Sequence, residues 1–220
     1  MLASEIINPV LKSVHEDVDN PVRWSIADLC EYLTDAMYQI VLLRPDANAK
    51  VEAVELVAGS TKQTLPDGGT QLLGVVRNMG ADGLTPGQAI SLVLRPSLDA
   101  ANLAWHTATG EEVIDHYAFN EKTPQVFWVT PVPAEGVYIE IEYAKTPEAV
   151  TGKDTEIELN AIWKGPLTNY VKYRCYAINA ASQADALKAK EFLSQFYMDL
   201  GEEAKARLVF NPNANEGSAS

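Results

Sequence analysis

Few residues in this 220-residue chain have the types and spacing that chemistry needs. The three histidines, His15, His106 and His116, stand in no HExxH or HxH pattern and have no neighbouring cysteine, so the spacing of zinc ligands is missing. We interpret them as solvated histidines of loops or sheet edges. Cys30 and Cys175 form neither a CxxC motif nor a disulfide framework, which indicates buried thiols in a reducing compartment. The sequence therefore predicts no metal and no cofactor.

Catalytic motifs are also missing. No GxSxG, P-loop or GxGxxG sequence occurs, and the glycines stand in turn contexts. Residues 16–20 resemble the start of a calcium loop, but counting from Asp17 puts Pro21 in the fifth position and Val22 where such a loop needs glycine. Because no nucleophile, base and oxyanion donors can be assembled from these motifs, we predict that the protein is not an enzyme.

Acidic side chains dominate the charge, with 30 Asp and Glu against 17 Lys and Arg and a formal net charge of −13. This balance argues against a surface that grips nucleic-acid phosphates, which needs clustered Lys and Arg. Residues 111–160 hold eleven acids and three lysines, a net charge of −8. The strand period puts Glu140 and Glu142 on one face, and Glu156 and Glu158 repeat this arrangement. The four glutamates predict an acidic sheet face; the alternative is a solvated face that maintains solubility.

The hydrophobic pattern changes along the chain from a helical period to a strand period and back. Ser25 is expected to cap a helix over residues 25–43, whereas Pro9 is expected to restrict the first helix to the segment after Asn8. The other predicted elements are strands at 51–57, 61–65, 89–94, 116–119, 125–130 and 137–143, an extended piece at 155–159, a strand or helix at 72–79, and helices starting at Pro96 and spanning 165–178 and 182–208. The first two strands are expected to form a hairpin.

This order of elements predicts an α+β fold, in which N- and C-terminal helices form a bundle and a β-rich, sandwich- or barrel-like insertion projects from it. The expected parts are helices at 1–48, the insertion at 49–160, helices at 161–209 and a loose polar tail at 210–220. We find no secretory signal and no uncharged apolar stretch of about 18 residues, so we expect a cytosolic protein without a membrane partner.

A series of short motifs carries a resemblance to a known family. The motifs are Pro21-Val-Arg-Trp-Ser25, Asp28-Leu-Cys-Glu-Tyr-Leu33, Ile40-Val-Leu-Leu-Arg-Pro-Asp-Ala47, Gln63-Thr-Leu-Pro66, Val75-Val-Arg-Asn-Met-Gly80 and Phe127-Trp-Val-Thr-Pro-Val-Pro133. Through residues 15–200 the chain resembles the head-to-tail adaptor proteins of tailed bacteriophages. It departs from their pattern at Thr34, where asparagine is expected, and at residues 160–165.

The resemblance implies a structural virion protein at the head-tail junction, made and assembled in the host cytoplasm. Such adaptors form a ring, usually of twelve copies, which connects the dodecameric portal to the tail or nozzle. The implied partners are other copies of the chain, the portal protein, and a tail nozzle or tail fibre protein. DNA is expected to pass through the channel of the ring without specific binding.

The same resemblance implies roles for two sets of residues. In related adaptors the C-terminal segment reaches the portal, so a portal contact is expected at Phe210, Asn211, Pro212 and Asn213. The acidic face with Glu140, Glu142, Glu156 and Glu158 is expected to face the channel or the next tail component, because carboxylates repel DNA phosphates.

A second reading of the sequence keeps a different class of protein open. The β-rich part could belong to a soluble ligand- or carbohydrate-binding module in which Trp128 and Tyr138 form an aromatic recognition surface. Such a module could remain monomeric, whereas an adaptor assembles, so the oligomeric state separates the two functions.

Overall fold

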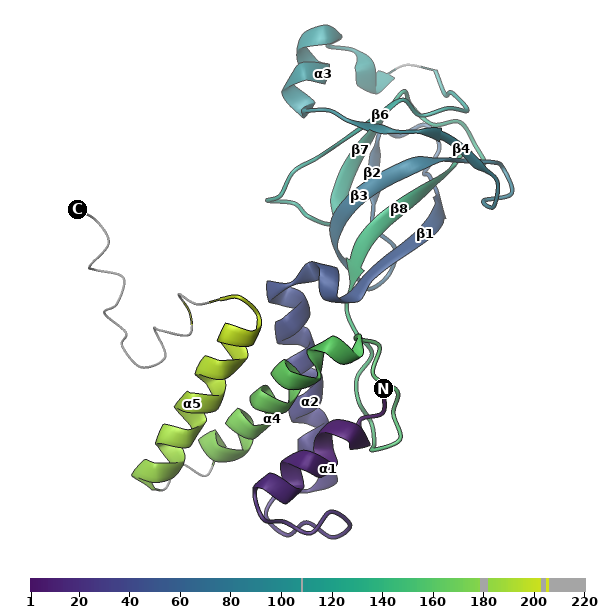
Figure 1. Cartoon of the computed structure of the whole chain (residues 1–220). Helices are drawn as coiled ribbons and strands as arrows, with labels where there is room; N and C mark the ends of the chain where they lie inside the picture. The colour runs from purple at the N-terminus through teal and green to yellow at the C-terminus, as the bar shows by residue number, and fades with distance from the viewer. Residues whose placement is uncertain (108, 179–181, 203–204, 206–220) are drawn as a thin grey trace, which may run out of the picture. The chain divides into compact units, whose positions relative to one another are not determined.

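The computed structural model describes residues 1–107, 109–178, 182–202 and 205, and it divides into two compact units. One unit combines Met1–Ala47 with the chain from Pro147 onward, and the other is Asn48–Thr146. The first is helical and the second is built of two β-sheets (Figure 1). The predicted α+β class, with terminal helices around a central β insertion, is confirmed.

In its described part, the helical unit has four helices: α1 (Ser4–Ser13), α2 (Ile26–Leu43), α4 (Lys164–Ile178) and α5 (Gln183–Asp199), with a 3-10 turn, η3 (Ala161–Trp163), before α4. Helix α4 packs against both α2 and α5 (Figure 1). The core joins residues from all four helices, among them Leu11, Leu33, Val171 and Phe196. Since the ends of the chain supply these side chains, the unit closes only when residues on both sides of the insertion meet.

Helix α2 begins where the sequence predicts, at a capping box. The Ser25 hydroxyl accepts a hydrogen bond from the Asp28 N–H at 3.1 Å, and the Asp28 carboxylate accepts one from the Ser25 N–H at 2.9 Å. These two bonds satisfy backbone donors that the first helical turn leaves free. Trp24, just before the cap, is 2% exposed and lies in the same core as Leu29.

Helix α1 differs from the prediction because it runs through Pro9 instead of starting after Asn8. A proline inside a helix removes one backbone hydrogen bond and costs about 3 kcal/mol or more. However, the apolar residues on both sides of the proline are fully buried: Ile6, Ile7, Val10 and Leu11. Full burial of each such side chain stabilises by roughly 1.5–3 kcal/mol, which outweighs the cost of the proline.

Two four-stranded sheets make the β unit. The first has the order β1 (Ala49–Glu55), β8 (Tyr138–Lys145), β3 (Gly69–Met79), β4 (Pro86–Ala89), and the second β2 (Lys62–Thr64), β7 (Val126–Thr130), β6 (His116–Phe119), β5 (Ser91–Leu92). Their inward side chains share one core, with Ile139 and Ile141 from the first sheet and Phe127 and Val129 from the second. The unit is therefore a sandwich, and the short helix α3 (Arg95–Ala101) follows β5.

The predicted hairpin of the first two strands is wrong. β1 pairs with β8 and β2 with β7, so consecutive strands belong to different sheets. The connection is held by a side chain, because the Gln63 amide accepts from the Val57 N–H at 2.8 Å and donates to its carbonyl at 3.1 Å. Of the predicted strand 89–94, Ala89 is the last residue of β4 and Ser91–Leu92 form β5. The segment predicted as strand or helix is strand β3, and Pro96 stands in the first turn of α3, as its position indicates.

The β insertion ends at Thr146, before the predicted boundary at residue 160. The segment that follows forms no strand, and its apolar side chains Val150, Ile157 and Leu159 lie in the core of the helical unit. Helix α5 also ends early, at Asp199, because Gly201 adopts a φ of +77° that breaks the helix. Part of its predicted extension to Leu208 lies outside the described residues.

Candidate functional site

The outward face of the first sheet carries two of the four predicted glutamates. On β8, Glu140 stands opposite Arg77 of β3, and Glu142 stands opposite Val51 of β1. The Arg77 Nε donates to the Glu140 carboxylate at 2.8 Å, with the two side chains 40% and 23% exposed. This face therefore remains acidic, but one of its carboxylates has a cationic partner, which the sequence alone does not indicate.

Two tyrosines of β8 hold carboxylates of β1. The Tyr138 hydroxyl donates to Glu55 at 3.0 Å on the outward face, and its hydrogen bond to that carboxylate raises the pKa of Tyr138. Tyr143 is 2% exposed, and its hydroxyl donates to Glu52 at 2.7 Å. Burial, followed by the bond to Glu52, raises the pKa of Tyr143 to about 12. Both pairs fix β1 against β8 with charge-assisted hydrogen bonds.

The other two predicted glutamates, Glu156 and Glu158, lie in the helical unit and belong to no strand. Both are exposed, and Glu156 forms an isolated bridge with Leu2. The predicted alternation is present, because Ile157 between them is buried. The expectation of one sheet face with all four carboxylates is nevertheless wrong, since alternation in a single segment does not determine which unit contains that segment.

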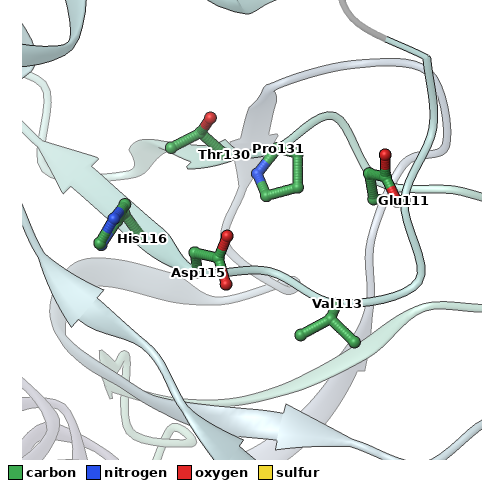
Figure 2. Close-up of a pocket in the computed structure, with 6 residues that line it drawn as sticks. All are labelled: Glu111, Val113, Asp115, His116, Thr130 and Pro131. Carbon is green, nitrogen blue, oxygen red and sulfur yellow. The ribbon is translucent and has the colours of Figure 1, made fainter. Parts of the chain in front are cut away.

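A hollow of about 450 Å³ in the β unit is lined by carboxylate, imidazole, hydroxyl and apolar side chains. Figure 2 shows its lining residues, Glu111, Val113, Asp115, His116, Thr130 and Pro131. The neighbours Asp115 and His116 lie at the start of β6, and Thr130 comes from the end of β7. The lining thus holds carboxylates, an imidazole and a hydroxyl, but these residues match none of the catalytic motifs considered in the sequence.

His15 and His106 are exposed, as predicted, whereas His116 is less solvated. The Nδ1 atom of His106 lies 3.0 Å from the Thr61 hydroxyl, at hydrogen-bond distance, and the His116 ring is half-buried with its Nδ1 atom covered. Among the described residues, no group of three His, Cys, Asp or Glu side chains is arranged to hold a metal ion. In the same part of the chain, no helix has the length and apolarity needed to cross a bilayer.

The two aromatic residues considered for a ligand-binding module lie on different sheets. Trp128 of β7 alternates with the buried Phe127, so it faces outward from the second sheet, where the Arg95 guanidinium lies 4.7 Å from its ring centroid. Tyr138 faces outward from the first sheet. The sandwich core separates these outward faces, so the two side chains do not form one recognition surface.

A cluster of cationic and aromatic side chains lies where α4 packs against α5, and the sequence analysis did not predict it. The Lys172 ammonium lies 5.2 Å from the Phe192 ring centroid, and the Lys188 ammonium lies 5.1 Å from that of Tyr176. The two rings stack with centroids 5.8 Å apart. We call these four residues the lysine–aromatic ladder. Its signal was present, because lysine and aromatic residue are four positions apart in each helix.

The residues predicted to contact a portal, Phe210, Asn211, Pro212 and Asn213, lie outside the described residues. The candidate surfaces on the described part of the chain are therefore the acidic outward face of β1, β8 and β3, and the helix surfaces with the ladder.

A family model described as SU10 adaptor protein matches residues 1–215, which includes the whole β unit and all but the last five residues of the helical unit. No curated protein matches the chain. The matched range contains all the motifs that carry the resemblance found in the sequence.

Proposed function

The chain belongs to the SU10 adaptor protein family of phage head-to-tail adaptors, and from this premise we propose that it forms a ring connecting the portal to the tail. Membership of the family makes the protein a structural adaptor of the virion. The finer proposal is a ring of twelve copies whose channel lets DNA pass. Adaptors of this kind are typically not enzymes, in agreement with the absence of catalytic motifs from the sequence.

The observation that carries the proposal is the family match over residues 1–215, which includes the whole β unit and all but the last five residues of the helical unit. A ring subunit needs side surfaces that join its neighbours and ends that meet other components. The helical unit has such surface available, because large apolar side chains remain exposed on it, including Leu42 at 72% and Ile162 at 75%. In a ring, such side chains would be available to pack against a neighbouring copy.

The acidic surfaces have a physical role in this proposal. A channel lined by carboxylates offers DNA phosphates no attractive contacts, so DNA can slide past it. We assign this role, or contact with the next tail component, to the outward face with Glu140 and Glu142. Glu156 and Glu158 would present a second acidic surface from the helical unit. The predicted portal contact at Phe210–Asn213 remains part of the proposal.

Charge also constrains assembly of the ring. Twelve copies with −13 each repel one another at long range. Salt screens such repulsion over about 8–10 Å, whereas buried apolar contacts are little affected. Assembly is therefore expected to favour moderate salt and the presence of the portal as a template.

The test uses the full-length protein and the portal of the same phage. We expect light scattering after gel filtration to give a mass of a closed ring for the mixture, and electron microscopy to show that ring on the portal. A truncated chain that ends at Leu208 should stay folded and bind the portal more weakly. A chain that stays monomeric and does not bind the portal at any salt concentration would exclude the ring.

A further inference from the structure

We propose that the lysine–aromatic ladder of one copy binds an acidic stripe on α2 of a second copy, so that the ring closes through unlike sides of the helical unit. The inference rests on the proposed ring and names the residues that join its subunits. It is carried by two surfaces of the same unit that differ in charge and in position.

The first surface is the ladder, which lies on the side of α4 that turns away from α2. Residues two positions apart lie on nearly opposite sides of a helix. The Arg174 guanidinium pairs with Asp35 of α2 and lies over the Tyr32 ring. Lys172, two residues earlier, therefore points to the opposite side, where it meets Phe192 of α5.

The ladder cations have aromatic contacts but no anions. In the part of the chain that the structure describes, neither Lys172 nor Lys188 forms an ion pair. The region 164–199 has five basic and three acidic residues, a net +2 within a chain of −13. A lysine held over an aromatic ring keeps its charge available to an incoming carboxylate, and the rings add apolar area.

The second surface is a stripe on α2, which has three acidic residues and no Lys or Arg. Its members share one side of the helix through spacings of four, three and four: Glu31, Asp35, Tyr38 and Leu42. Glu31 is exposed and forms no ion pair with any described residue, while Tyr38 and Leu42 are 39% and 72% exposed. We call these four residues the α2 stripe.

The two surfaces complement each other in chemistry. The stripe offers a free carboxylate at Glu31 and exposed apolar groups at Tyr38 and Leu42, and the ladder offers two ammonium groups beside two half-buried rings. A ring whose subunits all point the same way requires such a head-to-tail interface between unlike sides. Nucleic acid is a poorer partner for the ladder, since the rest of the chain carries a net charge of −15 and repels phosphates.

A charge swap tests the interface. Glu31→Lys and Lys188→Glu each place like charges together, and we expect each to weaken assembly of the full chain by about tenfold at 0.15 M salt, roughly 1.4 kcal/mol. The double variant E31K/K188E swaps both sides and should recover most of the lost affinity. Sedimentation velocity gives the assembly constants, with portal present if wild type needs it.

The control is Lys190→Glu, which makes the same charge change on α5 at an exposed position nearly opposite Lys188. It should assemble like wild type. Circular dichroism and urea unfolding check that every variant is folded, and recovery in the double variant cannot come from a misfolded chain.

The outcomes separate this inference from the proposed function. If wild type forms rings and E31K/K188E remains as weak as the single variants, or K190E is equally weak, the ladder does not bind the stripe and the ring proposal stands. If K188E leaves assembly intact but lowers binding of a DNA duplex, the ladder binds nucleic acid and the inference is overturned. If wild type never assembles, the proposed function itself fails.

Discussion

The hydroxyl of Thr34 accepts a hydrogen bond from the backbone N–H of Val150 at 3.0 Å and donates one to the Cys30 carbonyl at 2.9 Å. Thr34 is 9% exposed and lies in the middle of α2, and Val150 follows the β insertion. One buried side chain thus joins the returning chain to the helix that precedes the insertion. Thr34 is one of the two places at which the sequence is expected to depart from the adaptor pattern.

Replacing Thr34 by valine should destabilise the helical unit by about 1–3 kcal/mol, because the buried Val150 N–H loses its acceptor. Thr34→Ser keeps the hydroxyl and should cost less than the valine variant. Urea unfolding followed by circular dichroism measures both. Equal stability of T34V and wild type would show that this bond contributes nothing.

Stability should fall at high pH through Tyr143. Its pKa is about 12 in the folded protein and about 10 in an unfolded chain, so between these pH values the folded state binds more protons. The free energy of unfolding therefore decreases as pH rises through this window, by on the order of 2 kcal/mol. Tyr143→Phe should lose this pH dependence of the free energy of unfolding. If the free energies of wild type and Y143F fall equally between pH 10 and pH 12, Tyr143 is not its cause.

Cys175 should be unreactive in the folded protein. It is fully buried, and burial raises the pKa of its thiol to about 12, so almost none is thiolate at pH 8. Burial also raises the pKa of Cys30. Neither thiol should react with Ellman's reagent before the helical unit unfolds, and both should react in guanidinium. A cysteine that titrates in native buffer would indicate opening of this core.

The acidic outward face is tested by Glu140→Lys together with Glu142→Lys. If this face lines the channel, particles should still assemble but release DNA more slowly, since lysines attract phosphates. The first substitution also replaces the anionic partner of Arg77 by a second cation, so a stability loss of about 0.5–1 kcal/mol is expected and must be measured separately. Glu112→Lys with Glu121→Lys is the control, with the same charge change at exposed positions elsewhere in the β unit. Unchanged assembly and ejection would remove the face from both channel and tail interface.

Elements with a local cause could be predicted from the sequence. Helix α2 follows from the Ser25 cap and its apolar period, and β6, β7 and β8 follow from alternation between turn residues. What remained hidden depends on partners distant in sequence. Nothing in residues 51–65 indicates that β1 pairs with β8 instead of β2, because pairing is decided by contacts across the sandwich.

In the candidate surfaces, too, features set by local sequence could be predicted, whereas features set by contacts between distant segments could not. Alternation correctly put Glu140 and Glu142 outward on one strand, but it could not assign Glu156 and Glu158 to the helical unit. The ladder joins two helices, so its four residues become a group only when α4 packs on α5. A search of the sequence for lysines four residues before an aromatic residue would have found the pair in α4 and the pair in α5. It would not have shown that the two pairs are in contact.

The pairing of β1 with β8 has a further consequence for how such a protein can diversify. The β unit starts and finishes on neighbouring strands, where Ala49 stands opposite Ala144 and the Asn48 side chain donates to the Lys145 carbonyl at 2.9 Å. The chain therefore enters and leaves the β unit at neighbouring positions. Such an insertion can be replaced by another domain, or shortened to a turn, without a change in the sequence of the helical unit.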